Sequence, residues 1–597
     1  MDKELVTAMV SIGVLGIGAQ WLAWRLRLPS IVLLMLAGLL AGPVAGVIDP
    51  SRDFDGLLYP FIALSVAIIL FEGGLNLRWH EYREAGIDVI RLVTAGLLLS
   101  GILGSVAAHY IGGLSWPVAL LFGTISVVTG PTVILPMLKQ ARLRRRPAAL
   151  LKWEGIINDP LGALLTVLVF EYFSASQHAL AVGDVFVNLG VALAVALASG
   201  VACAYLLKRI FYRGQVPEYL KAPVLLAAIL VLYVLMNAVQ EEAGLLAVTI
   251  AGFALANFRL RNIEELQRFS RYLTLLLVSG IFILLSADIK MDVLMRLDWS
   301  SAALIAAIVF IVRPVAVYVS TLGTGIDWRE RVLTGWIAPR GIVAAAVAGI
   351  IGPRMVEASY PGADQLLPLV FALIMATVLL HGLSIGWLAR RLDLASDRTN
   401  GLLIVGASPW SVDLAQAFQE LEVPTVVSDS SWNHLYNARM KGVRVHHDHI
   451  LSERSDDTLE LHELSYLLSA TANDAYNALV CTHFAPEFGR NRVYQLPSQE
   501  NGDGDLRMMA RSMRGRIAFD RKFHYDGFMR CHYAGWKFRW SRVDAEDGGE
   551  NLPAAPGKGA VPLVLVREKG EILFYPLDDD EAPRPGDRVI SYHPPGG

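Results

Sequence analysis

Charged side chains are scarce in this chain of 597 residues. Asp, Glu, Lys and Arg together make up 18% of it, whereas about 25% is usual in a soluble protein. Apolar residues make up 54%, and a soluble domain could not bury so much apolar surface. The composition therefore excludes an intrinsically disordered chain, a fibrous protein and a purely soluble enzyme, and it predicts that most of the chain faces lipid.

Cysteine is also rare, with three residues in the whole chain. Cys203 lies in an apolar run, whereas Cys481 and Cys531 lie far apart in a more polar C-terminal part. This spacing argues against a disulfide-stabilised scaffold and suits a reducing compartment for the C-terminal part. The N-terminal sequence lacks the small-residue cleavage site of a signal peptide, so we expect its first apolar stretch to remain as a membrane helix.

Long apolar runs fill the chain up to about residue 390. A membrane-spanning helix needs about 20 mostly apolar residues, and windows of this length predict about thirteen spans. The expected spans lie near residues 5–24, 29–48, 57–75, 90–110, 115–138, 148–172, 184–208, 222–239, 244–258, 270–288, 300–322, 332–352 and 364–388. We therefore expect a polytopic α-helical membrane domain over residues 1–392.

Basic residues are concentrated in alternate loops between these spans. Examples are Arg144, Arg145 and Arg146 after the fifth span, and Arg390 and Arg391 after the last. Loops rich in Lys and Arg face the cytoplasm by the positive-inside rule. With an odd number of spans, this places the N-terminus outside and the C-terminal domains in the cytoplasm, in a multi-pass protein of the cell (inner) membrane.

A few ionisable or strongly polar residues interrupt the apolar runs: Glu154, Asn158 and Asp159 in the sixth span, Arg313 in the eleventh and Arg340 in the twelfth. An arginine keeps its charge when buried and needs a carboxylate, so we expect Glu154 and Arg340 to form a structural ion pair. Asp159 is then left without a cation of its own, and a desolvated carboxylate is neutralised by a proton or by a bound cation. This is the chemistry of a proton/cation exchange site.

Helix-breaking residues lie at mid-membrane depth in two of the expected spans. Gly130 and Pro131 interrupt the fifth span beside Thr129, and Pro339 interrupts the twelfth beside Arg340. Broken helices in corresponding positions of two halves are typical of transporter binding sites. Their freed carbonyl and hydroxyl groups can replace water around a small cation.

Four motifs together resemble the monovalent cation/proton antiporters. They are FEGGLNL (71–77), TGPT (129–132), EGIINDP (154–160) and PRGIVA (339–344). The Asn158–Asp159 pair is similar to that of the electroneutral Na+/H+ exchanger branch, which includes NhaP and the animal NHE exchangers. The resemblance implies two inverted repeats, a rigid dimerisation part that forms a homodimer, and a mobile core in which the broken fifth and twelfth spans cross.

The resemblance also implies roles for individual residues. Asp159 would bind the transported metal cation, Na+ or alternatively K+ or Li+, or else a proton. Thr129 and Glu72 would help to coordinate the cation, and Asn158 would help to hold the core together. One departure is Gly155, where relatives often have a serine, and it leaves the choice between Na+ and K+ open.

The chain after the last span changes to an alternation of strands and helices. Residues 393–500 read as a Rossmann-like domain that resembles the RCK (TrkA-N) regulatory domain. Residues 501–597 read as a linker and a small β-rich domain similar to TrkA-C. The connection at 395–400 is too short in sequence for a freely tumbling tether.

The expected nucleotide-binding turn of this part departs from the G-x-G-x-x-G fingerprint. Gly406, Ser408 and Ser411 stand where three glycines are usual, and Asp429 follows about 20 residues later, as a ribose-binding acid would. Two alternatives stay open: a regulatory adenine nucleotide held by Gly406, Ser408 and Asp429, or a nucleotide-free dimerisation or sensing module. No cofactor is required for transport.

The sequence thus predicts a secondary antiporter that exchanges Na+ for H+ electroneutrally, with both ions competing for Asp159 and with the cytosolic part modulating activity. A K+/H+ antiporter of the same fold is the nearest alternative. A regulated cation channel is a further alternative, but no TVGYG-like filter sequence occurs. No nucleophile–base constellation indicates an enzyme, and no nucleic-acid partner is expected.

Overall fold

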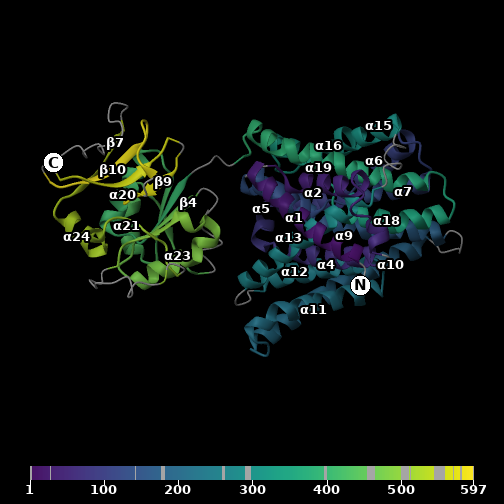
Figure 1. Ribbon diagram of the computed structural model, residues 1–597, viewed down its shortest axis with the longest axis horizontal. Coiled ribbons are helices and arrows are strands. Elements are labelled where there is room, and N and C mark those ends of the chain that lie inside the picture. The colour runs from purple at the N-terminus through teal and green to yellow at the C-terminus, as the bar shows by residue number, and fades with distance from the viewer. Residues whose placement is uncertain are drawn as a thin grey trace. The chain divides into compact units, whose positions relative to one another are not determined.

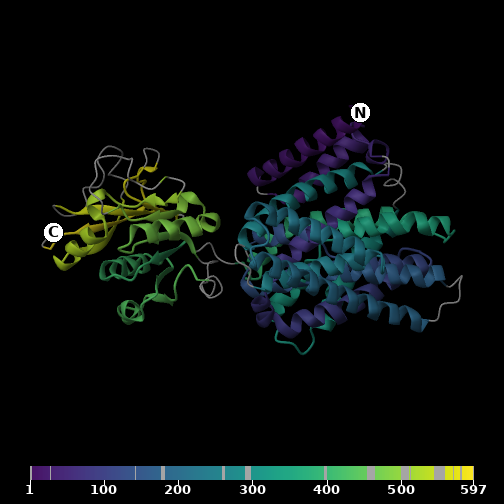
Figure 2. The ribbon, with the colours of Figure 1, turned by 90° about the horizontal axis from the view of Figure 1, so that it is seen from below.

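The computed structural model divides into two compact units, Met1–Ala395 and Ser396–Gly597, which are described separately. It describes residues 3–26, 28–54, 56–141, 143–175, 182–258, 263–289, 298–395, 400–452, 464–498, 510, 513–543, 559–568, 570–577 and 581–595. In the first unit, helices lie side by side in one bundle, with the N-terminal helix at its edge (Figures 1 and 2).

The helices of this unit follow the apolar windows of the sequence. They are α1 (Lys3–Leu26), α2 (Ser30–Leu39), α3 (Pro50–Asp53), α4 (Leu58–Leu75), α5 (Trp79–Arg91), α6 (Leu97–Tyr110), α7 (Trp116–Ile125), α8 (Pro131–Ala141), α9 (Arg145–Ala175), α10 (Val182–Tyr212), α11 (Glu218–Asn237), α12 (Ala243–Asn257), α13 (Ile263–Ala287), α15 (Trp299–Ala307), α16 (Arg313–Ser320), α17 (Trp328–Trp336), α18 (Ile342–Glu357) and α19 (Leu366–Arg391).

Nine helices of the described part are long and apolar enough to cross a membrane. The helix at Ser30–Val44 and α12 are apolar but shorter. The remaining two expected spans are interrupted helices, α7 with α8 and α17 with α18. Each expected span therefore has its helix or helix pair, and the polytopic helical membrane domain is confirmed.

Three helices contain a π-helical turn, which accommodates one residue more than an α-helical turn. The turns are η1 (Leu40–Val44), η2 (Leu92–Gly96) and η3 (Ile308–Val312). η2 lies between α5 and α6 in the fourth span, and η3 lies between α15 and α16 in the eleventh. These two spans directly precede the two interrupted ones, so each interruption follows a helix with a π turn.

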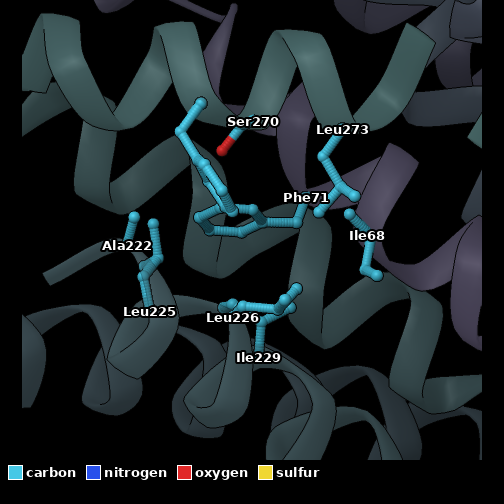
Figure 3. A pocket seen from close by; sticks show the side chains of 9 residues that line it. Ile68, Phe71, Ala222, Leu225, Leu226, Ile229, Ser270 and Leu273 are labelled. Atoms are coloured by element: carbon cyan, nitrogen blue, oxygen red, sulfur yellow. The ribbon is translucent and has the colours of Figure 1, made fainter. Parts of the chain in front are cut away.

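The helix α4 packs closely on α12 through glycine. A Cβ atom on Gly74 would lie 2.2 Å from the carbonyl oxygen of Thr249, and one on Gly252 would lie 2.2 Å from that of Phe71. On another side, α4 meets α11 and α13 through large side chains, around a small pocket lined by Ile68, Phe71 and their neighbours (Figure 3). α4 is thus held between two layers of the bundle.

The second unit contains a six-stranded parallel sheet in the order β3-β2-β1-β4-β5-β6. Its strands are β1 (Gly401–Val405), β2 (Thr425–Asp429), β3 (Arg444–His447), β4 (Leu464–Ser469), β5 (Val493–Gln495) and β6 (Arg516–Ile517), and its helices include α20 (Pro409–Glu420), α21 (Trp432–Met440) and α23 (Asp474–Phe488). This strand order is that of a Rossmann-type sheet. The parallel α/β domain is confirmed, and its last strand lies beyond the boundary expected at residue 500.

Both faces of the parallel sheet are covered, as its apolar strands require. Successive residues of β1 point to opposite faces: Leu402 and Ile404 belong to one apolar core, and Leu403 and Val405 belong to another. The second core is closed by α23, which contributes Phe484. The first core continues into a small antiparallel sheet.

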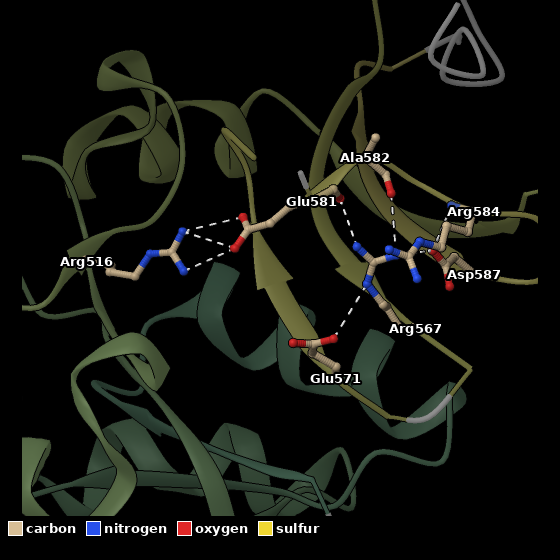
Figure 4. Close-up of polar contacts among 7 residues, drawn as sticks. All are labelled: Arg516, Arg567, Glu571, Glu581, Ala582, Arg584 and Asp587. Atoms are coloured by element: carbon tan, nitrogen blue, oxygen red, sulfur yellow. Dashed lines mark hydrogen bonds and ion pairs between the residues drawn. The ribbon is translucent and has the colours of Figure 1, made fainter. Parts of the chain in front are cut away.

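This small sheet has the order β7-β10-β8-β9. Its strands are β7 (Lys537–Arg542), β8 (Val561–Val566), β9 (Ile572–Phe574) and β10 (Arg588–His593), and α24 (Tyr525–Tyr533) precedes them. Polar contacts tie it to the parallel sheet (Figure 4): Arg516 of β6 pairs with Glu581 at 3.4 Å, and Arg567 pairs with Asp587 at 3.2 Å. Because Arg567 also donates to the backbone carbonyl of Glu581 at 3.1 Å, the contacts form one network.

Candidate functional site

The two interrupted helices cross in the middle of the bundle. The chain leaves the helical conformation between the end of α7 and the start of α8, and again between α17 and α18. Gly130 lies in the first interruption, Pro131 is the first residue of α8, and Pro339 lies in the second interruption. Thr129 and Arg340 form an antiparallel bridge between the two extended segments, so the crossed arrangement that the resemblance implies is present.

The crossing depends on two glycines. A Cβ atom on Gly341 would lie 2.5 Å from the Cα atom of Gly130, and one on Gly130 would lie 2.7 Å from the Cα atom of Gly341. Real Cβ atoms essentially never come so close to another heavy atom. The two backbones can therefore touch only because neither residue has a side chain.

The helix α9 packs with one face against the first interruption. A Cβ atom on Gly155 would lie 2.9 Å from the side chain of Ile134 in α8, and one on Gly162 would lie 2.7 Å from that of Val128. Asp159 is four residues after Gly155 and three before Gly162, so the three share one face of the helix. The carboxylate of Asp159 is thereby directed toward the segment in which the fifth span is broken.

Four buried oxygen atoms around this interruption accept no hydrogen bond in the part of the chain that the structure describes. They are Oδ1 of Asp159, Oδ1 of Asn158, Oγ1 of Thr129 and Oγ1 of Thr132. Buried polar atoms rarely lack a partner in folded proteins. Carboxylate, amide and hydroxyl oxygens are the ligands that hard cations take. These four oxygen atoms therefore fit as ligands of a small cation that has lost part of its hydration shell.

Asp159 is only 1% exposed. Among the described residues, no cation lies within ion-pair distance of its carboxylate. A buried, unpaired carboxylate is costly in a low-dielectric environment unless a proton or a cation neutralises it. The carboxylate of Asp159 can therefore be neutralised in two ways, by a proton or by a cation, and each excludes the other.

The expected pairing of Glu154 with Arg340 is wrong, because Glu154 pairs with Arg313. Nη2 of Arg313 donates to Oε2 of Glu154 at 2.8 Å, and a second contact between Nη1 and Oε1 makes the pair bidentate. Nη2 also donates to the carbonyl oxygen of Thr334 at 2.9 Å. Arg313 follows the π turn η3 directly, and its planar guanidinium matches the carboxylate geometry.

Arg340 supports the crossing instead. Its Nη1 atom donates to the carbonyl oxygen of Val127 at 3.2 Å, in the first interruption. Its backbone N–H donates to Oγ1 of Thr377 in α19 at 3.2 Å. Arg340 remains close enough to be attracted by Glu154 and repelled by Arg313. The side chain of Arg340 therefore supplies a hydrogen bond to a carbonyl oxygen that has lost its helical partner in the first interruption.

His381 is a site residue that the sequence did not single out. It is buried in α19, and its Nδ1 atom accepts a hydrogen bond from the backbone N–H of Ala338 at 3.4 Å. Its ring lies edge-on to that of Trp336, the last residue of α17. Thr377 and His381 lie four residues apart on an apolar helix, and both satisfy N–H groups of the second interruption. In the sequence, two polar residues four positions apart in an otherwise apolar span were the signal that could have pointed to Thr377 and His381.

Glu72 lies in the last turn of α4, close to the first interruption. A Cβ atom on the adjacent Gly73 would lie 3.5 Å from Pro131 and 3.7 Å from Ile156. Oε1 of Glu72 accepts a hydrogen bond from Nδ2 of Asn76 at 2.8 Å. The structure thus brings Glu72 to the region of the site, while its coordinating role stays a prediction.

The turn expected to bind a nucleotide is occupied by its own hydrogen bonds. The N–H of Ala407 donates to Oδ2 of Asp429 at 2.9 Å. The N–H of Ser408 donates to Oγ of Ser411 at 2.9 Å, and the N–H of Ser411 donates to Oγ of Ser408 at 3.3 Å. A phosphate bound at a helix N-terminus accepts hydrogen bonds from N–H groups that have no other partner. Three N–H groups of the turn after Gly406 are thus already paired within the chain, and a nucleotide held by Gly406, Ser408 and Asp429 stays a prediction.

Comparison with known proteins identifies the helical unit. Residues 10–391 match the family model for "Sodium/hydrogen exchanger, transmembrane". The chain is 28% identical over 368 residues to the Na+/H+ antiporter 1 of Methanocaldococcus jannaschii, covering 59% of this chain and 85% of that protein. It is 25% identical over 425 residues to the K+/H+ antiporter NhaP2 of Shewanella sp. strain ANA-3, covering 69% of this chain and 73% of that protein.

A solved structure shares the fold of this unit. It is the structure at pH 8 of the sodium proton antiporter MjNhaP1 from Methanocaldococcus jannaschii, which matches with a TM-score of 0.58 and 26% sequence identity. The match covers 65% of this chain and 99% of that chain.

Glu154→Gln should destabilise the protein, because it leaves the Arg313 guanidinium buried without its carboxylate. Breaking a buried ion pair from one side costs about 3–5 kcal/mol. Adding Arg313→Gln should recover part of this loss, whereas adding Arg340→Gln should not. Thermal unfolding of the purified variants in detergent measures the effect. Equal recovery by both second changes would contradict the assignment of the pair.

Gly341→Ala should also destabilise the protein, because the added methyl group would push the two interruptions apart. Overpacking of this kind costs about 1–3 kcal/mol. Gly352→Ala is the matched control in the same helix, since its Cβ would meet only Leu367 at an ordinary 3.9 Å. Thermal unfolding should separate the two variants, and an unchanged midpoint for Gly341→Ala would show that the crossing tolerates a side chain.

Proposed function

We propose that this chain, which belongs to the sodium/hydrogen exchanger family and is thus a monovalent cation/proton antiporter, exchanges Na+ for H+ electroneutrally across the cell membrane. The observation that carries the proposal is the buried carboxylate of Asp159, which faces the crossed helix interruptions and has no cation partner among the described residues. The chain is a transporter, not an enzyme.

The proposed exchange uses one carboxylate for two ions. In one state a Na+ ion neutralises Asp159, with Oγ1 of Thr129 and freed backbone carbonyls completing its shell. In the other state a proton is bound to the same carboxylate. Because the two ions need the same oxygen atoms, each displaces the other, and binding can be coupled to alternating access of the site.

Electroneutrality follows from the charges around Asp159. Glu154 is the other buried carboxylate of this region, and its charge is already balanced by the bidentate contact with Arg313. It is therefore not available for a second cation or proton. One Na+ exchanged for one H+ at Asp159 moves no net charge.

A K+/H+ antiporter is the second candidate. The Methanocaldococcus relative is named for Na+ and the Shewanella relative for K+, at similar levels of identity. Gly155 bears on this choice, because a serine there would clash with Ile134 unless the packing of α8 changed. The site thus lacks a hydroxyl ligand that relatives often have, and the proposal of Na+ rests on the likeness of Asn158–Asp159 to the Na+/H+ exchangers.

For orientation and assembly, we propose that the N-terminus faces the outside, the second unit faces the cytoplasm and the protein is a homodimer. The orientation is supported by the basic loops of the sequence. The helices α1 and α11 are candidates for lipid-facing or subunit-facing surfaces, since only 22% of each apolar window is buried within the chain.

We further propose that the cytosolic unit modulates transport through the segment that enters it. Oδ1 of Asp393 pairs with Arg144 at 3.1 Å, and Oδ2 pairs with Arg329 at 3.3 Å. The N–H of Arg144 donates to the carbonyl of Leu394 at 2.8 Å. This clamp joins the exit segment to the loop between α8 and α9 and, through Arg329, to α17; α8 carries Thr132 and α9 carries Asp159.

Asp159→Asn should abolish exchange while leaving the protein folded, because asparagine keeps the size but can neither release a proton nor neutralise a cation. Dissipation of a pH gradient in everted vesicles by Na+, K+ and Li+ measures exchange and also ranks the cations. Glu357→Gln removes an exposed carboxylate from the last turn of α18 and should transport normally. Normal transport by purified Asp159→Asn in liposomes would contradict the proposed site.

Deletion of residues 401–597 should change the pH or cation dependence of transport without abolishing it, because the site itself remains. Asp393→Ala in the full-length chain should shift the dependence in the same direction, since it removes the ion pairs that hold the end of the first unit, from which the chain continues into the second. The pH profile and the apparent KM for Na+ are the readouts. An unchanged profile in both variants would show that the cytosolic unit serves assembly only.

A further inference from the structure

A groove with a volume of about 620 Å3 lies between α16, α17 and α19. Aromatic side chains dominate its walls: Tyr318, Trp328, Trp336 and Trp387. Besides the hydroxyl of Tyr318 and the indole N–H groups, the lining includes the hydroxyl of Ser384 and one charged group, the guanidinium of Arg331. None of the residues whose oxygen atoms were assigned to the ion site lines this groove.

The rim of the groove belongs to the outer surface of the bundle. Trp328, Trp387 and Tyr318 are 60%, 62% and 55% exposed. In a membrane-spanning unit, such exposed aromatic and apolar side chains are covered by lipid, and Trp and Tyr are enriched where the hydrocarbon meets the headgroups. α17 begins at Trp328 and α19 ends at Arg391, so the groove lies at the helix ends, in this boundary layer.

Arg331 is held in position for an anion. Its Nε atom donates to Oγ1 of Thr321 at 3.0 Å, and Nη2 donates to the carbonyl of the same residue at 3.1 Å. Its guanidinium also lies 5.4 Å from the ring centre of Tyr318. Among the described residues, no carboxylate pairs with Arg331, and Nη1 has no hydrogen-bond partner. A preorganised guanidinium with a free N–H binds phosphate well.

We propose that this groove binds an anionic phospholipid of the surrounding bilayer, with an acyl chain between the aromatic side chains and the phosphate on Arg331. Lipid is the occupant that the position favours, because the aromatic rim is exposed on the surface of a membrane-spanning bundle and the walls of the groove are mainly apolar. Charge favours an anionic lipid, because arginines outnumber acidic residues near the same helix ends. The arginines are Arg329, Arg331, Arg390 and Arg391; the acidic residues are Asp327, Asp393 and Glu330, of which Glu330 pairs with Arg146.

The bound lipid would touch the second helix interruption through Trp336. Nε1 of this residue donates to Oγ of Ser384 at 2.8 Å, and its ring packs on His381. His381 in turn accepts the N–H of Ala338 in the interruption. Occupancy of the groove can therefore stabilise one arrangement of the crossing. This effect on transport rests on the proposed function, whereas lipid binding itself does not.

Lipid binding can be measured on the purified full-length protein without transport. Phosphatidylglycerol should be retained in native mass spectra and should raise the unfolding temperature more than phosphatidylcholine with the same acyl chains. Arg331→Gln should weaken the binding of phosphatidylglycerol about tenfold, as the loss of a charge-assisted hydrogen bond implies. Arg354→Gln, in the last turn of α18 and outside the lining of the groove, is the matched control and should bind nearly normally.

A second variant tests the acyl-chain part of the groove. Gly335 lines the wall, and a Cβ there would make an ordinary contact of 3.5 Å with Pro314, so Gly335→Leu should fill the groove while leaving Arg331 in place. This variant should retain less of both lipids, and brominated phosphatidylglycerol should quench its tryptophan fluorescence less than that of the native chain.

Three results would overturn the proposal: unchanged retention of phosphatidylglycerol by Arg331→Gln, equal binding of both lipids by the native chain, or unchanged retention by Gly335→Leu. The transport arm compares liposomes with and without phosphatidylglycerol. A lipid-dependent rate that disappears in Arg331→Gln supports the link to the crossing. If Asp159→Asn transported normally while the lipid results held, the exchange mechanism would fail and the lipid site would stand.

Discussion

The contact between the backbones of Gly130 and Gly341 is the constraint on which the rest of the membrane unit depends. Both spans have left the helical conformation where they touch, so each leaves N–H and C=O groups without their usual partners inside the bundle. Arg340, Thr377 and His381 then satisfy part of these groups. Beside the crossing, side-chain oxygen atoms of Thr129, Thr132, Asn158 and Asp159 stay without partners among the described residues, and we assign the exchanged ions to this place.

The buried charges around the crossing form a simple balance. Arg313 neutralises Glu154, while Arg340 and Asp159 have no partner of opposite charge among the described residues. The four side chains sum to zero when Asp159 is ionised, and to one positive charge when it holds Na+ or H+. The two loaded forms are therefore electrically equivalent, and only the empty form differs. This is the condition under which one site can carry either ion at the same electrical cost.

The sequence was informative where a property depends on composition or local spacing. Apolar windows located the spans, Gly130, Pro131 and Pro339 located the interruptions, and unlike charges drew attention to the sixth and twelfth spans. It was uninformative where a partner is chosen in three dimensions. Two arginines competed for Glu154, and charge alone does not rank them. Thr377 and His381 bind backbone groups, which no residue type reveals, and the closed turn after Gly406 depends on hydrogen bonds that only the folded loop makes.

The π turn η3 shows how such a choice is made. An α-helix advances by about 100° per residue, so an extra residue in an α-helical turn would rotate everything after it by that angle. A π turn takes up the extra residue locally, and the residues after it keep their phase. Arg313 is the first residue after η3, and it is buried beside Glu154, whereas Phe310 and Ile311 within the turn are exposed. The ion pair thus depends on the rotational phase of a helix and not on residue identity. If the same residues formed an uninterrupted α-helix without this π turn, Arg313 would be rotated away from Glu154, although both members of the pair would still be present in the chain.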